Sequence, residues 1–248
     1  MSSHQLFELL VAMHIATGSI GLASFWVPIA SRKGGRNHAR WGRLFTYMML
    51  ITGTLAVGIA ATTLSDPVGT HPQLATHPEF SNPAVIRGIF GWMMLYLATL
   101  TVNLAWQGWL CINNRRDHSA NRAWHNLLLQ VLLTAASVNC LWQGWLIRQP
   151  LMMAISLVGF ATVATNLWFL YKPRPRPVDR LKEHIKSLVG AGISVYTAFF
   201  AFGAVRFIPE LALTPALWSV PLITGLFLII YHQRAITRRM QRSPVAAT

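Results

Sequence analysis

Histidines recur beside the basic segments that join the long apolar stretches of this chain. His38, His125 and His184 stand at or just before the start of apolar stretches, His118 shares a connection with His125, and His232 ends the last stretch. Imidazole nitrogens bind transition metals and haem iron. Ligands for one cofactor must lie at one depth and come from different helices, and this group meets that condition. The alternative is that histidine, like Lys and Arg, populates the wet ends of membrane helices.

His14 lies apart from this group, inside the first apolar stretch. An ionisable side chain at membrane depth is a functional candidate by default. The alternative is a neutral imidazole that is hydrogen-bonded to neighbouring backbone or to an Asn or Gln side chain. The 16 residues from His14 to Ala30 span roughly 24 Å of helix. We therefore expect His14 in the outer half of the membrane, where it shares no cofactor with the other histidines.

Composition indicates the environment of these residues. The 248-residue chain is 53% hydrophobic and only 11% charged, whereas a soluble domain carries about twice that charge. The net charge of +14 comes from 21 Lys and Arg that cluster between apolar stretches. That distribution favours membrane topology over nucleic-acid binding, and the partners we expect are membrane lipid and other membrane subunits.

Seven stretches are apolar over about the 20 residues that a membrane helix needs. They cover approximately residues 6–30, 43–64, 84–111, 123–147, 150–171, 187–207 and 214–233. The prediction is an all-α fold, a single bundle of seven transmembrane helices that covers residues 1–248. Pro150 and Pro215 stand where the first turn of a helix tolerates proline.

Charge gives this bundle an orientation. Of the 21 Lys and Arg, 18 fall in alternate connections and in the C-terminal tail, and short cytoplasmic loops are the ones that retain such residues. We expect the N-terminus outside and the C-terminus in the cytoplasm of a bacterial inner membrane. No basic region precedes the first apolar stretch, so we expect that stretch to stay as a helix.

A nine-residue motif occurs twice. Val102–Leu110 and Val138–Leu146 are identical at seven of nine positions, with an Asn, a Gln, a Gly and two Trp in each copy. Asn and Gln inside a membrane need partners, and glycine lets helices approach closely. Helix packing is the expected role, and a ligand site is the alternative. Cys111 and Cys140 are predicted to be buried free thiols.

The longest outer connection, Leu64–Ala84, holds Asp66, His71, His77 and Glu79 but no Lys or Arg. Imidazole and carboxylate together suit zinc or copper, so a metal site is one interpretation. A polar loop made rigid by proline is the other. The chain has seven acidic residues, and none lies centrally in a predicted helix. The sequence therefore predicts no buried carboxylate for a proton relay, which disfavours a proton-coupled carrier.

The first hairpin carries a motif. His14 and Gly18 form His-x-x-x-Gly, and Lys33, Gly34, His38, Gly42, Arg43 and Phe45 form a basic Lys-Gly-x-x-x-His-x-x-x-Gly-Arg-x-Phe connection. The chain resembles a bacterial family of predicted polytopic membrane proteins of unknown function that has both patterns. The resemblance covers about the first 150 residues and implies no established activity.

Three functions are compatible with these features. The first is a redox or cofactor-binding membrane protein that uses His38, His125 and His184 as ligands and His14 as an outer ligand or polar contact, with haem b or a transition metal as the cofactor. The second is an accessory or assembly subunit of a larger membrane complex, suggested by ten tryptophans and the Asn/Gln repeats. The third is a small-molecule carrier.

Overall fold

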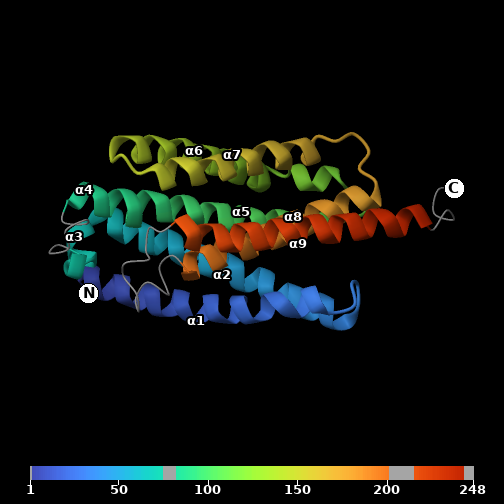
Figure 1. Cartoon of the computed structure of the whole chain (residues 1–248), viewed down its shortest axis with the longest axis horizontal. Coiled ribbons are helices and arrows are strands. Elements are labelled where there is room, and N and C mark those ends of the chain that lie inside the picture. Colours follow the sequence, from blue (N-terminus) through green and yellow to red (C-terminus); the bar gives the residue numbers. More distant parts are fainter. Residues whose placement is uncertain (1, 75–81, 201–214, 243–248) are drawn as a thin grey trace. The chain divides into compact units, whose positions relative to one another are not determined.

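The computed structural model describes residues 2–74, 82–200 and 215–242, and no strand occurs within these ranges. The seven long helices are α1 (Ser3–Ala30), α2 (Arg36–Ser65), α5 (Met94–Asn113), α6 (Trp124–Leu146), α7 (Pro150–Leu170), α8 (Pro177–Ala198) and α9 (Pro215–Arg242) (Figure 1). Two short helices, α3 (Pro67–Thr70) and α4 (Pro83–Ile86), lie between α2 and α5, and a π-helical segment, Arg87–Met93, joins α4 to α5. The all-α prediction is confirmed, and Pro150 and Pro215 each open a helix as expected.

Six helices in the described part of the chain are long and apolar enough to cross a membrane, as expected for a multi-pass membrane protein. They are Ser3–Ala30, Arg36–Ser65, Pro83–Asn113, Trp124–Leu146, Pro150–Leu170 and Leu217–Arg239. The stretch predicted at 187–207 is absent from this set. Its helix, α8, carries charged residues through its first three turns, and residues 201–207 lie outside the described residues.

The start of α8 differs most from the sequence-based prediction. The helix begins at Pro177, ten residues before the predicted start, because several local contacts favour that position. Pro177 occupies the first helical position, where a proline costs no hydrogen bond. The Asp179 carboxylate accepts hydrogen bonds from the Arg176 backbone at 2.9 Å and from Lys172 Nζ at 2.9 Å. The Lys/Arg-rich segment predicted as a connection is therefore largely helical.

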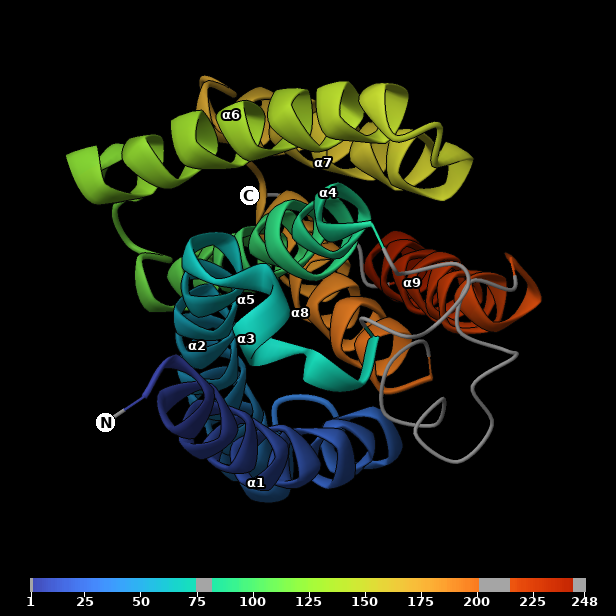
Figure 2. The same ribbon diagram turned by 90° about the vertical axis from the view of Figure 1, so that its left-hand side faces the viewer.

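The chain divides into two compact units. The first contains residues 1–103 and 129–163, and the second contains residues 104–128 and 164–248, so α5, α6 and α7 contribute to both. In the first unit α1 and α2 lie side by side as an antiparallel hairpin (Figure 2). A Cβ at Gly21 would overlap the end of the Met49 side chain, so glycine allows this close approach. The rings of Phe25 and Phe45 pack 5.4 Å apart.

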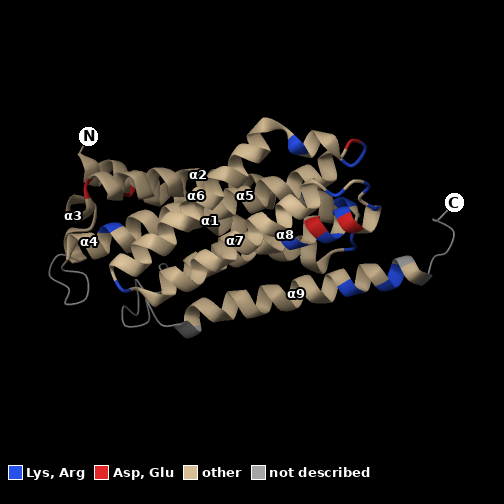
Figure 3. Ribbon diagram, turned by 90° about the horizontal axis from the view of Figure 1, so that it is seen from above, with Lys and Arg blue, Asp and Glu red and all other residues tan. Residues whose placement is uncertain are grey.

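The turn of this hairpin provides its own helix cap. The last carbonyls of a helix have no partner within the helix. Here Lys33 Nζ donates to the carbonyls of Pro28 at 2.9 Å and Ile29 at 2.6 Å, and His38 Nδ1 donates to Pro28 at 3.0 Å. Cations at a helix C-terminus also interact favourably with the helix dipole. The basic connection thus stabilises the end of α1. Figure 3 marks the Lys and Arg positions of the chain in blue along the ribbon.

Close packing also characterises the remainder of both units. In the first unit, the Tyr96 hydroxyl in α5 donates to the Ile155 carbonyl in α7 at 2.6 Å. In the second unit α8 and α9 lie side by side, and a Cβ at Gly225 would overlap Ile193. Cys111 and Cys140 are both buried and unpaired with each other. This confirms the prediction of free thiols.

Candidate functional site

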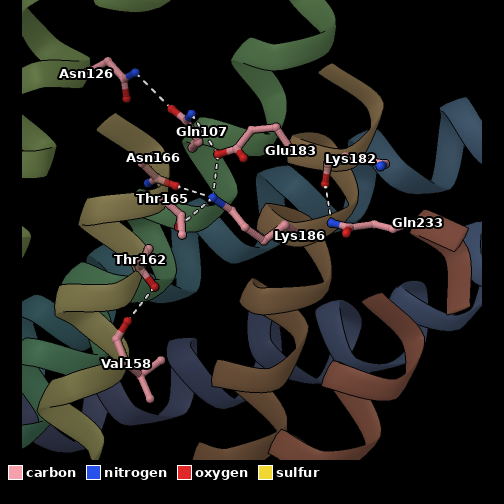
Figure 4. Close-up of polar contacts among 10 residues, drawn as sticks. All are labelled: Gln107, Asn126, Val158, Thr162, Thr165, Asn166, Lys182, Glu183, Lys186 and Gln233. Atoms are coloured by element: carbon pink, nitrogen blue, oxygen red, sulfur yellow. Dashed lines mark hydrogen bonds and ion pairs between the residues drawn. The ribbon is translucent and has the colours of Figure 1, made fainter. Parts of the chain in front are cut away.

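A buried polar network lies within the second unit and joins four helices. Its members are Gln107 in α5, Asn126 in α6, Thr165 and Asn166 in α7, and Glu183 and Lys186 in α8 (Figure 4). Gln107, Asn126 and Asn166 are fully buried and Glu183 is 7% exposed, whereas Thr165 lies at the exposed edge of the network. We refer to these six residues as the polar network.

Side-chain hydrogen bonds connect α6 to α5 and α5 to α8. The Asn126 amide donates to Gln107 Oε1 at 3.1 Å, and Gln107 Nε2 donates to Glu183 Oε1 at 3.2 Å. Asn126 also donates to the Asn121 carbonyl at 2.7 Å. Both the oxygen and the nitrogen of the Gln107 side chain therefore form hydrogen bonds, and this side chain connects α6 to α8.

An ion pair forms the centre of the network. Lys186 Nζ lies 2.7 Å from Glu183 Oε1, 2.9 Å from Asn166 Oδ1 and 3.0 Å from Thr165 Oγ1. These three acceptors match the three protons of an ammonium group. The side chains of Glu183 and Lys186 are only 8% and 22% exposed, and charges are removed from water only when they are paired and hydrogen-bonded. The cluster satisfies that condition.

Glycines in α5 and α8 let these helices approach closely. A Cβ at Gly108 would lie 2.7 Å from a Leu188 side-chain carbon, and one at Gly190 would lie 3.2 Å from Leu104. Gly108 belongs to the first copy of the repeated motif, and Gly144 in the second copy is similarly close to Met152, at 2.8 Å. The packing role predicted for the motif's glycines is confirmed in both copies.

The two copies of the motif nevertheless have different surroundings. Asn103 and Gln107 in the first copy are fully buried. The equivalent residues of the second copy, Asn139 and Gln143, are only half-buried. Only the first copy therefore contributes to the polar network.

Three of the four predicted ligand histidines donate a ring N–H to the backbone. The bonds run from Nδ1 of His14 to Thr52 O at 3.0 Å, of His38 to Pro28 O at 3.0 Å, and of His184 to Gly108 O at 2.8 Å. A carbonyl can only accept, so Nδ1 carries a proton, and in the neutral form of the ring Nε2 is then the acceptor nitrogen. Metal-bound histidines show this arrangement, and so do structural histidines. For His14, this contact matches the alternative to a functional role, in which the imidazole is hydrogen-bonded to neighbouring backbone.

The fourth, His125, packs its ring against Trp106 with the centroids 5.6 Å apart. His184 instead contacts α5 at Gly108. Residues two positions apart point to different sides of a helix, so His125 and His184 contact different sides of α5. Among the residues that the structure describes, no group of three or more His, Cys, Asp or Glu could hold a metal ion. A shared cofactor for these histidines stays a prediction.

The carboxylate of Glu183 corrects one sequence-based expectation. The sequence predicted no buried carboxylate, because Glu183 fell in a segment interpreted as a charged connection. The earlier start of α8 places Glu183 in a helix and against α5. The spacing of Glu183 and Lys186, three residues apart, was the available signal, since such residues are neighbours on a helix.

In the first unit, His71 is buried between two aromatic rings. Its ring centroid lies 4.8 Å from those of both Phe7 and Phe90, and its Nδ1 lies 3.0 Å from Thr70 Oγ1. His77 and Glu79, the other predicted ligands of this connection with Asp66, lie outside the described residues. Asp66 accepts a hydrogen bond from the backbone of Gly69 at 2.9 Å and so caps α3. These contacts match the interpretation as a rigid polar loop.

His71 is expected to make stability depend on pH. Burial lowers the pKa of its imidazole from 6.5 to about 4, a bond with Pro67 partly opposes this, and nearby His4 adds to it. The folded protein binds this proton less readily than the unfolded chain, so the contribution is complete above pH 6.5 and is lost as the pH falls toward 4. The melting temperature in detergent at pH 7 and pH 4.5 measures it. A His71→Phe variant should show a smaller fall than the wild type, and an equal fall would contradict the assignment.

No family model, no curated protein and no solved structure matches this chain. The functional interpretation therefore depends on the chain's own residues. The resemblance of the first hairpin to a family of membrane proteins stays a prediction.

Proposed function

We propose that this protein is a proton-linked carrier of small carboxylate anions, with the Glu183–Lys186 pair as its ionisable centre. The supporting observation is the buried ion pair within a bundle of apolar helices. Ionisable residues in such surroundings characteristically mark ion and substrate pathways. Packing between apolar helices would require neither the carboxylate of Glu183 nor the ammonium group of Lys186.

The contacts of the pair suggest how it would operate. Lys186 links α8 to Asn166 and Thr165 of α7, and Glu183 links α8 to Gln107 of α5. A proton taken up by Glu183 would remove the charge that Lys186 neutralises. The ammonium group would then be available to a carboxylate substrate, and the connection between α7 and α8 would weaken. Uptake of a proton and of an anion would thus be coupled at one site.

The topology belongs to the same proposal. We place the N-terminus outside and the C-terminus in the cytoplasm of a bacterial inner membrane, and we keep the apolar stretch predicted at 187–207 as the seventh span of the sequence-based topology. The basis is the sorting of Lys and Arg to alternate connections. A reporter fused after Thr248 tests the orientation.

Transport by the purified protein in liposomes tests the function. Uptake of radiolabelled lactate, succinate and glutamate would be recorded with and without an inward proton gradient, because one proton that moves with one monoanion carries no net charge. We expect proton-dependent uptake of at least one of these anions. Glu183→Gln should abolish it. Glu8→Gln removes a carboxylate whose side chain is 66% exposed and should leave it unchanged.

Two results would contradict the proposal. One is the absence of uptake with all three anions, and the other is equal proton-dependent uptake by the wild type and Glu183→Gln. A folded state for the variant, checked by its elution from a sizing column, makes either result conclusive.

Cofactor binding is a second candidate, supported by the Nδ1 bonds of His14, His38 and His184 to backbone carbonyls. Those bonds place a proton on Nδ1, so Nε2 is the nitrogen that would bind iron or another metal. An absorption spectrum and metal analysis of the purified protein test it. The absence of both a Soret band and stoichiometric metal would eliminate this candidate.

A further inference from the structure

A groove with three cationic side chains lies between α8 and α9. It has a volume of about 420 Å³ and is lined by Lys182, Ile230, Gln233, Arg234, Thr237 and Arg238. None of these residues carries a carboxylate. Across the part of the chain that the structure describes, no ion pair involves the three cations of the groove. The groove is therefore positively charged, and the described residues form no ion pair that would neutralise it.

The two walls of the groove are held together. Gln233 Nε2 in α9 donates to the Lys182 carbonyl in α8 at 3.1 Å (Figure 4). Arg234 and Arg238 are four residues apart on α9 and so lie on one face of the helix. Glu183, the acidic residue beside Lys182, is buried and pairs with Lys186 instead. The cations therefore converge from two helices onto one fixed space.

The groove also joins an apolar surface. Ile230 is 47% exposed, and Leu226 and Phe227, one turn earlier on α9, are 46% and 66% exposed. These residues belong to the candidate membrane span Leu217–Arg239. Along α9 the surface therefore changes from apolar to cationic within two turns. A phospholipid has the complementary order of acyl chain and then phosphate.

We propose that the α8–α9 groove binds the phosphate group of an anionic phospholipid. Guanidinium groups pair with phosphate oxygens through two parallel hydrogen bonds, which suits Arg234 and Arg238. Lys182 contributes a positive charge from the opposite wall, and the acyl chains lie against Ile230 and Leu226. This site is separate from the polar network and does not depend on the proposed transport function.

Native mass spectrometry of the full chain, released from detergent with added lipid, tests the site. The binding of phosphatidylglycerol and of phosphatidylcholine is compared for three proteins. These are the wild type, Lys182→Gln/Arg238→Gln, and Arg174→Gln/Arg239→Gln, which loses the same charge from exposed positions outside the groove. Each basic residue near a membrane surface contributes about 1 kcal/mol, so the loss of two from the groove should weaken the binding of phosphatidylglycerol about thirtyfold. The control should retain wild-type affinity.

Competition by inorganic phosphate identifies the source of the phosphate group. If millimolar phosphate leaves the phosphatidylglycerol adduct intact, the lipid is the ligand, as proposed. If phosphate displaces the lipid from the wild type, the groove is a site for soluble phosphate compounds and the lipid assignment is overturned. Equal weakening in the groove variant and the control, or equal binding of both lipids, would overturn the site itself.

Discussion

Replacement of Lys186 by Met is expected to lower the free energy of unfolding by about 3 kcal/mol. Met has a similar length but no charge, so the variant leaves the Glu183 carboxylate buried with one hydrogen bond from Gln107. Loss of one partner of a buried pair is costly because the other charge is left uncompensated. The 22% exposure of the Lys186 side chain places the effect at the lower end of the usual range. Unfolding by SDS titration in mixed micelles measures it.

Two further variants make this prediction specific. Glu183→Gln/Lys186→Met removes both charges and should recover a large part of the lost stability, since no uncompensated charge remains. Lys182→Met makes the same change one turn away, outside the network, and should alter stability by less than about 0.5 kcal/mol. If the effects of the two single substitutions simply add in the double variant, the two residues are not coupled and the network has no energetic centre.

Gly159→Val is expected to lower the free energy of unfolding by about 2 to 3 kcal/mol, because α7 has no room for a side chain at this position. A Cβ at Gly159 would overlap the Ser137 hydroxyl and lie 2.8 Å from the Tyr96 ring. Tyr96 is fully buried and held by its bond to the Ile155 carbonyl, so its ring cannot move aside without loss of that bond. The same SDS titration measures the effect.

Gly42→Ala is the matched control in α2. The nearest atom to its Cβ would be a Pro28 carbon at 3.9 Å, an ordinary contact. Alanine favours a helix over glycine by up to about 1 kcal/mol, so this variant should be neutral or more stable. A loss of stability at Gly42 as large as that at Gly159 would show that helix propensity, rather than space, governs both positions.

The sequence predicts a helix well where the residues of that helix alone determine where it begins and ends. Apolar stretches of about 20 residues locate α1, α2, α6 and α7, because the thickness of a membrane sets their length. Proline at the first helical position marks the starts of α7 and α9. The start of α8 was missed because its first three turns carry charged residues, and a membrane-length criterion excludes them.

The site was harder to predict because burial depends on neighbouring helices. Gln107 and Gln143 occupy equivalent positions in the repeated motif, yet only Gln107 joins the polar network. The copies differ only at Leu104/Cys140 and Ala105/Leu141, and neither difference indicates which copy is buried. The histidines show the same limit, because a common position at helix ends does not determine which sides of a helix they contact. His125 and His184 both contact α5, but on different sides.

The self-capped turn between α1 and α2 has a consequence for biogenesis. Lys33 and His38 lie within ten residues of the carbonyls that they bind in the preceding helix, and the seam of the hairpin is formed by these two helices. Contacts so close in sequence form early, before the later parts of the chain are synthesised. We therefore expect the N-terminal hairpin to form as a pair while translation of the later helices continues.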